Sequence, residues 1–160
     1  MTGLLIGIAR RSGKRAPMEE LRSGMITVEA GLEGDSRGAT FKKRQITVLS
    51  REDWAAALLA LAGAPALPWT LRRANLLVEG VRLPRAKGGV LRVGQVELEI
   101  TNQTNPCYRM DEAHKGLLSA LHPEWRGGVT CRVLVGGAIA LGDSVEVLVA
   151  PKEHVIKLPG

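Results

Sequence analysis

Seven short segments of the chain alternate or run apolar in the way that β-strands do. Gly-rich turns separate them, so the pattern predicts many strands with short connections. Such a pattern is typical of a barrel, and we expect a mainly β fold, a closed or partly closed β-barrel with two or three short helices. The predicted strands are residues 4–9, 25–30, 45–50, 75–80, 96–101, 131–137 and 144–150.

The first predicted helix begins after Ser50, whose side chain can cap the amides of the first turn. Asp53 stands where it can complete a capping box. The apolar residues Trp54, Leu58 and Leu61 follow at helical spacing and predict the buried face.

A second helix is predicted to begin near Asp111 and to run through Ala113, Leu117 and Leu121. Pro123 should end it, because proline breaks the hydrogen-bond pattern of a helix. No repeat or Pro/Ser-rich linker divides the 160 residues, so one domain is expected over 1–160, with its core at about 6–149. The tail 151–160 is expected either to be loose or to dock.

The net charge and the number of aromatic residues indicate which kinds of ligand the protein is expected to bind. The net charge is +6, yet there are only three Trp, one Tyr and one Phe to stack on bases. This composition argues against nucleic acid, and a small phosphorylated ligand explains the positive charge as well. The longest apolar run is broken by glycine and prolines, and no secretory signal precedes it, so we expect a cytoplasmic protein without a membrane contact.

The two cysteines have different sequence contexts. Cys107 follows a proline between a predicted strand and the second helix, with Arg109 and Lys115 nearby, so it is either a packed thiol or a reactive one. Cys131 lies inside VTCRVLV, where alternation places it with Val129, Val133 and Val135 and opposite Arg132. We expect Cys131 to be buried, with the pKa of its thiol raised.

Two further motifs carry polar groups that could meet an anion. The loop GLEGDSRG, residues 31–38, contains Asp35 and Arg37, which could bind a ligand, cap one another or fix the turn. The segment RRANLLVEG begins with Arg72 and Arg73, followed by Asn75. Arginine can hold phosphate through a bidentate fork, although a solvated strand end explains the same residues.

Other kinds of site find no support in the sequence. The three histidines, His114, His122 and His154, are not spaced as zinc ligands. No G-x-S-x-G, Walker loop or G-x-G-x-x-G before a helix is present. These absences argue against the common hydrolases, kinases and dehydrogenases.

The order of the motifs from about Ile6 to Val149 resembles the MOSC domain, named for the C-terminal domain of molybdenum cofactor sulfurase. The segments that carry the resemblance are GLEGDSRG, RQITVLSRED, RRANLLVEG, LRVGQVELEI, NPCYRMDE and CRVLVGGAIALGDSVEV. The resemblance implies a mostly β, barrel-like domain. It also implies that Cys107 is the central functional residue, which carries sulfane sulfur as a persulfide or ligates molybdenum.

The same resemblance implies a set of residues around a molybdenum cofactor (molybdopterin). Arg73 and Asn75 match the family's R-x-N motif, and Thr104 matches a position that tends to face the cofactor. Asp35 falls on the G-D loop, and Arg37 stands where histidine is frequent. Arg109 is expected to join these residues as a cation beside the thiol.

Three functions remain open from the sequence. The first is a sulfur carrier or sulfurtransferase that binds a molybdenum-pterin cofactor. The second is a molybdenum-dependent reductase of N-hydroxylated compounds, with Cys107 as metal ligand. The third is a basic binding module without catalysis. We expect no pyridoxal phosphate on this chain, so a cysteine desulfurase or an electron donor would be a separate protein.

Overall fold

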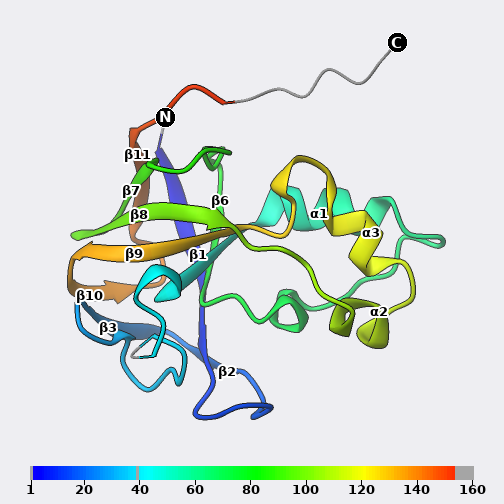
Figure 1. Cartoon of the computed structure of the whole chain (residues 1–160), viewed down its shortest axis with the longest axis horizontal. Coiled ribbons are helices and arrows are strands. Elements are labelled where there is room, and N and C mark those ends of the chain that lie inside the picture. The colour runs from blue at the N-terminus through cyan, green and yellow to red at the C-terminus, as the bar shows by residue number, and fades with distance from the viewer. Residues whose placement is uncertain (1, 39, 154–160) are drawn as a thin grey trace.

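The fold is a barrel of seven strands that closes on itself (Figure 1). The computed structural model describes residues 2–38 and 40–153. Around the barrel, neighbouring strands follow the order β1, β11, β7, β8, β9, β5 and β6, and β6 pairs with β1 again. The mainly β, barrel-like prediction is therefore confirmed. These strands are β1 (Thr2–Arg10), β5 (Ile46–Ser50), β6 (Leu76–Glu79), β7 (Val90–Val93), β8 (Val96–Gln103), β9 (Val129–Val135) and β11 (Ser144–Val149).

Most barrel strands pair antiparallel, but β5 and β6 run parallel. A parallel pair needs a crossover connection, because a tight turn would reverse the chain. Here the crossover contains helix α1 (Arg51–Leu59) and the short 3-10 helix η2 (Trp69–Arg72). It therefore brings Arg72 and Arg73 back to the start of β6, at one end of the barrel.

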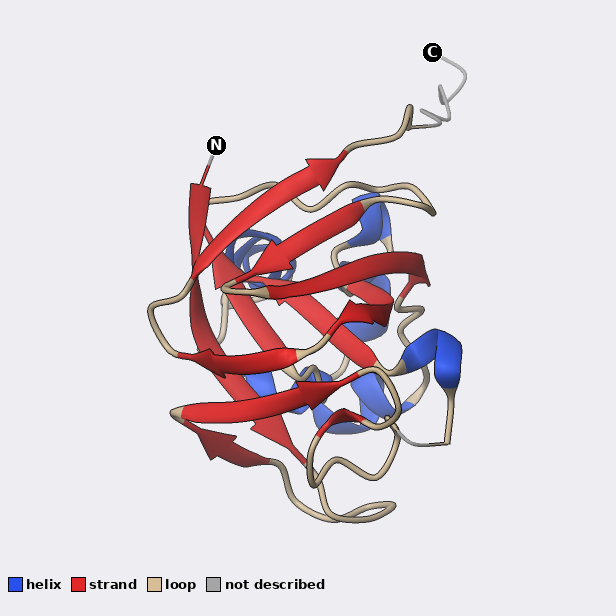
Figure 2. Ribbon diagram, turned by 90° about the vertical axis from the view of Figure 1, so that its left-hand side faces the viewer, coloured by secondary structure: helices blue, strands red, loops and turns tan. Residues whose placement is uncertain are grey.

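The remaining strands of the described residues lie outside the closed ring. β2 (Glu19–Leu21) extends the sheet from β1. A small sheet of β10 (Gly137–Ala140), β3 (Ser23–Thr27) and β4 (Gly31–Leu32) lies against β8 and β9. Figure 2 shows strands on this side of the molecule and helices behind them.

Each predicted strand segment overlaps an observed strand, with corrected boundaries. The segment 25–30 is shifted, because β3 begins at Ser23 and ends at Thr27, and the following residues form a turn. The segment 131–137 was misplaced, because the strand starts at Val129 and ends at Val135, which is exposed. Four strands were not predicted: β2, β4, β7 and β10 have only two to four residues each, which is too short to show alternation.

Two apolar clusters hold the fold together. One fills the barrel and includes the fully buried Leu5, Leu98 and Ile100. The other joins the helices to the outside of the barrel through Trp54 and Leu121. Burying one such side chain contributes about 1.5–3 kcal/mol. The helices therefore gather on one side of the barrel, as Figure 1 shows for α1, α2 and α3.

Ser50 caps α1 as predicted, and its Oγ accepts a hydrogen bond from the Asp53 amide at 3.3 Å. The predicted capping box is wrong in one respect, because the Asp53 carboxylate does not accept a hydrogen bond from the Ser50 amide. The Asp53 carboxylate instead pairs with Arg85 at 3.2 Å, while Glu52 accepts a hydrogen bond from the Ser50 hydroxyl. Trp54 and Leu61 are buried and Leu58 is half-buried, as the apolar spacing indicated.

The second predicted helix is two helices, α2 (Arg109–Ala113) and α3 (Leu117–Leu121). Gly116 separates them with a φ of 91°, a left-handed conformation that no α-helix contains. Two further 3-10 helices are η1 (Lys42–Arg44) and η3 (Pro123–Trp125). No helix in the described part of the chain is long and apolar enough to cross a membrane.

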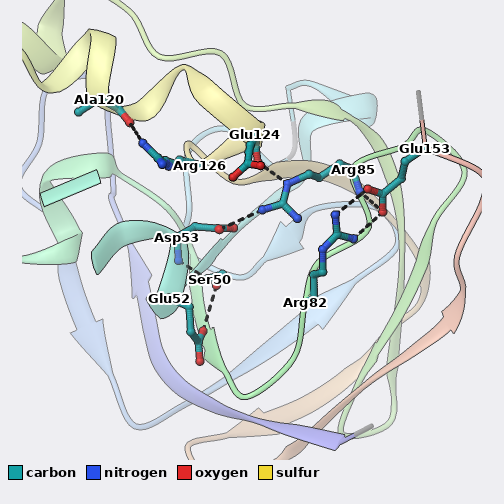
Figure 3. Close-up of polar contacts among 9 residues, drawn as sticks. All are labelled: Ser50, Glu52, Asp53, Arg82, Arg85, Ala120, Glu124, Arg126 and Glu153. Atoms are coloured by element: carbon teal, nitrogen blue, oxygen red, sulfur yellow. Dashed lines mark hydrogen bonds and ion pairs between the residues drawn. The ribbon is translucent and has the colours of Figure 1, made fainter. Parts of the chain in front are cut away.

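The start of the C-terminal tail docks on the body of the protein (Figure 3). Glu153 accepts hydrogen bonds from both terminal nitrogens of Arg82, at 2.6 and 2.7 Å, and from the Arg85 amide at 3.3 Å. Arg85 in turn contacts Asp53 and the carbonyl of Glu124. The prediction for residues 154–160 lies outside the described residues.

Candidate functional site

A cavity of about 670 Å³, here called the main cavity, opens at the end of the barrel where β8 leads into α2. Eight of its 19 lining residues are arginine or lysine, and none is aspartate or glutamate. A cationic wall that contains no carboxylate attracts anions. The eight cations are Arg11, Arg37, Lys43, Arg44, Arg72, Arg73, Lys87 and Arg109.

Cys107 lies in the wall of the main cavity and is exposed. It belongs to the segment between β8 and α2, as the sequence indicated. Its carbonyl accepts a hydrogen bond from the Met110 amide at 2.9 Å, which fixes the turn at the start of the helix. The thiol can therefore be reached by a ligand in the cavity.

Arg72 ties together the two chain segments that border the thiol. Its Nη2 donates to the Thr104 carbonyl at 2.7 Å, and its Nε donates to the Gly127 carbonyl at 3.0 Å. Burial lowers the pKa of the Arg72 guanidinium to about 10, and a negative charge on Cys107 counteracts that decrease. Arg72 thus shapes the cavity and places a positive charge in the wall that contains Cys107.

Three side-chain atoms of cavity-wall residues are buried without a partner in the described structure: Arg11 Nε, Arg73 Nη1 and Thr104 Oγ1. A buried polar atom usually has a hydrogen-bond partner, so each of these calls for an explanation. Arg73 has a φ of 63°, a left-handed conformation that follows from its position at the end of η2. All three atoms belong to residues that line the main cavity, where a polar ligand could supply the missing partner.

Arg37 and Arg11 form a second cationic group in the wall. Arg37 Nη2 donates to the Arg73 carbonyl at 2.6 Å, which anchors the loop 31–38 against η2. Burial, followed by repulsion from Arg11, lowers the pKa of Arg37 to about 10. Burial and the charge of Arg73 lower the pKa of Arg11 as well. An anionic ligand would relieve this repulsion.

Two residues expected at the cofactor do not line the main cavity: Asp35 and Asn75. The Asp35 carboxylate accepts a hydrogen bond from the Arg11 amide at 3.0 Å. The Asn75 amide oxygen accepts from the Thr47 amide at 3.0 Å and hydroxyl at 3.1 Å, and its Nδ2 donates to the Ala9 carbonyl at 3.2 Å. Asp35 and Asn75 therefore hold the cavity-lining residues Arg11 and Thr47 in place without lining the cavity themselves.

The structure brings together Cys107, Arg73, Thr104, Arg37 and Arg109 from the predicted set. Lys115, expected near the thiol, is exposed and does not line the cavity.

The sequence interpretation missed four lining cations: Arg11, Lys43, Arg44 and Lys87. The runs ARR and KKR at the ends of predicted strands are the signals that could have indicated three of them. Lys87 lies in a Gly-rich turn between predicted strands and carries no comparable signal.

Cys131 lies inside the barrel and is fully buried, as predicted. Burial raises the pKa of its thiol far above the usual value, so it does not react at neutral pH. Cys107 is therefore the reactive candidate of the two.

The structure thus combines a closed β-barrel with an exposed thiol in a cationic cavity whose lining contains no carboxylate. The family model of the MOSC domain matches residues 19–146. The chain belongs to the MOSC domain family, which is associated with molybdenum cofactor binding. A search of the curated proteins finds no match.

Solved structures share the fold at low sequence identity. The YuaD protein from Bacillus subtilis is 22% identical, with a TM-score of 0.73 over 92% of this chain and 96% of that one. YiiM from Escherichia coli is 20% identical, with a TM-score of 0.65 over 96% of this chain and 72% of that one. YiiM from Geobacillus stearothermophilus is 14% identical, with a TM-score of 0.63 over 91% and 73%.

The residues present fit a phosphorylated pterin that carries a metal. The main cavity is within the usual size of small-molecule sites, and its unpartnered Arg73 and Thr104 atoms suit phosphate and pterin polar groups. Within the described residues no group of three His, Cys, Asp or Glu side chains could hold a metal ion. A soft metal would therefore depend on Cys107 and on the ligand that carries it.

Proposed function

We propose that this protein carries sulfane sulfur on Cys107 and binds a molybdenum-pterin type cofactor in the main cavity. The observation that supports this most is an exposed thiol in a wall with eight cations and no carboxylate. A persulfide is anionic near neutral pH, and so is a pterin phosphate, so one positive cavity can attract both. The process served is the maturation of a molybdenum or metal–sulfur centre.

The sulfur step needs no oxidant. The Cys107 thiolate attacks the outer sulfur of a donor persulfide, R–S–SH, and a new S–S bond forms. The S–S bond of the donor breaks and the donor leaves as a thiolate, while Cys107 becomes Cys107–S–SH. Arg72 lines the same cavity and offers its positive charge to the anionic sulfur species. A cysteine desulfurase is the class of enzyme that supplies such a persulfide.

The cofactor side of the cavity depends on other residues. Arg73 binds the phosphate through its free Nη1, and the Thr104 hydroxyl donates to an acceptor on the ligand. Arg37 and Arg109 add charge on either side. When bound, the cofactor supplies a molybdenum centre that can accept sulfur or a thiolate.

Incubation with a cysteine desulfurase, its pyridoxal phosphate and cysteine tests the proposal. We expect mass spectrometry of the alkylated protein to find one added sulfur on Cys107 in the wild type and in Cys131→Ser. The matched variant Cys107→Ser should gain none. If sulfur reaches a known acceptor in the same assay but not Cys107, sulfur carriage is wrong.

The molybdenum-dependent reductase is separated from sulfur carriage by metal and pterin analysis. Protein from molybdate-supplied cells that holds stoichiometric molybdenum, lost in Cys107→Ser, and that takes up no sulfur would act as a reductase. Cofactor binding that survives Cys107→Ser but fails in Arg73→Gln supports the carrier, because the phosphate and not the thiol then holds the ligand.

A further inference from the structure

A second hollow of about 470 Å³ adjoins the main cavity. Four of its seven lining residues, Arg11, Arg37, Arg44 and Thr47, also line the main cavity, so the two spaces share a wall. The other three lining residues are Lys14, Ser36 and Phe41. The cavity system is therefore longer than the part beside Cys107.

The lining of the second hollow is positively charged, although the buried Asp35 carboxylate behind it counteracts the decrease in pKa that burial causes at Arg11 and Arg37. Its four cations are Lys14 and the three shared arginines, and its wall contains no carboxylate. No ion pair within 4.0 Å joins any of them to an acid in the described part of the chain. Arg11 keeps a buried Nε without a partner. A single phosphate bound at Arg73 in the main cavity would leave the cations of the second hollow without an anion.

Phe41 is the only phenylalanine of the chain, and its side chain remains 54% exposed at this hollow. It directly precedes η1, whose last residue is Arg44. Nucleotides bind where an exposed aromatic ring lies beside arginines, because the base stacks on the ring and the phosphate binds the cations.

We propose that the second hollow binds a nucleoside phosphate, with phosphate on Arg11, Arg37 and Arg44 and the base stacked on Phe41. The inference rests on the proposed function in placing a phosphorylated pterin in the main cavity. The nucleotide is then either free or joined through a pyrophosphate to that pterin. The hydroxyls of Ser36 and Thr47 are the neutral polar groups of the wall, available to a ribose or phosphate oxygen.

Calorimetric titration with ADP, GDP and CDP, compared with inorganic pyrophosphate, tests this assignment. We expect at least one nucleotide to bind about tenfold tighter than pyrophosphate, because stacking adds to the phosphate contacts. Phe41→Leu should remove that advantage and leave pyrophosphate binding unchanged. Tyr108→Leu, which changes an exposed aromatic residue outside the hollow, should have no effect.

Lysine variants test the charge in the same titration. Lys14→Gln should weaken nucleotide and pyrophosphate binding together, by about threefold for one lost phosphate contact, while Lys115→Gln should weaken neither. The inference is overturned if every nucleotide binds no tighter than pyrophosphate, or if Phe41→Leu weakens pyrophosphate as much as nucleotide.

Flavin adenine dinucleotide, whose flavin ring resembles a pterin, separates the two sources of the nucleotide. Binding about tenfold tighter than ADP, with the gain lost in Arg73→Gln, identifies an elongated ligand that spans both spaces. Equal binding identifies a free nucleotide. The titrations are repeated on Cys107→Ser, which should bind as the wild type does. If the protein binds no nucleotide but still takes up sulfur on Cys107, only this inference is overturned. If it binds nucleotide but takes up no sulfur, only the proposed function is overturned.

Discussion

Arg73 and Asn75 stand two residues apart in the sequence and have different surroundings. Arg73 follows η2 in a left-handed conformation and lines the cavity, while Asn75 is 1% exposed and satisfies the backbone of neighbouring segments. Asn75 directly precedes β6 and binds Thr47 in β5 and Ala9 in β1, so it joins three strands of the barrel. Of the two residues in this motif, Arg73 therefore lines the cavity and Asn75 is a positioning residue.

Replacing Asn75 by Ala should lower the free energy of unfolding by about 2–4 kcal/mol, because several buried polar groups lose their partner at about 1–3 kcal/mol each. Urea unfolding measures the loss. Gln95→Ala is the matched control, since Gln95 is exposed and makes only a 3.4 Å contact. An unchanged unfolding midpoint in Asn75→Ala would contradict the positioning role.

At the scale of elements, the thiol is placed by the meeting of three segments. η2 supplies Arg72, the end of β8 leads to Thr104, and the turn before β9 supplies Gly127. Gly127 leaves room for the guanidinium: an added Cβ would lie 2.6 Å from the Thr104 carbonyl oxygen and 3.0 Å from Arg72 Nη2. This arrangement depends on contacts distant in sequence.

Gly127→Ala should therefore displace Arg72 and destabilise the protein by about 1–3 kcal/mol, as overpacking does. We also expect the alkylation rate of Cys107 to change, since the segment that carries it loses its anchor. Gly13→Ala is the control, because an added Cβ there meets nothing within 4 Å. Thermal unfolding and alkylation of both variants give the comparison, and equal behaviour would refute the anchoring role of Arg72.

The tail after β11 is held mainly by Glu153. Its hydrogen bonds to Arg82 lower the pKa of the carboxyl to about 2. A depressed carboxyl pKa stabilises the fold above the unfolded value of about 4.5, and the contribution is lost as the pH falls from there towards 2. The pair is partly exposed, so Glu153→Gln should cost only about 0.2–1 kcal/mol at pH 7.

Unfolding of the wild type and Glu153→Gln at pH 7 and at pH 2 checks this expectation. The difference between the two proteins should be present at pH 7 and should be reduced at the lower pH. A difference that grows on acidification would show that Glu153 does not act as the anionic partner of Arg82.

For the whole molecule, the sequence was informative where the pattern is local. Alternation located β1, β5, β6, β8 and β11, and the Ser50 cap located α1. The barrel closure between β1 and β11 and the parallel pair of β5 and β6 are pairings between distant segments, which periodicity does not encode.

The residues of the candidate site were likewise predictable only where a local motif or the family resemblance indicated them. The Pro-Cys motif and the family resemblance indicated Cys107, Arg73 and Thr104, all of which line the cavity. Lys87 carries no local signal, and the run KKR does not tell that Lys43 meets the other cations, because a charged residue on a turn usually faces solvent. Only the barrel end brings them to one wall.

The central claim is that Cys107 is an accessible thiol in an electropositive cavity, and two thiol reagents of opposite charge test it most directly. In Cys131→Ser, the rates of an anionic sulfonate and a cationic trimethylammonium methanethiosulfonate are compared, each divided by its rate with N-acetylcysteine. We predict that the anionic reagent reacts about tenfold faster at low salt, with a preference that shrinks as salt screens the cavity. An unreactive Cys107, or equal or faster reaction with the cationic reagent, would contradict it.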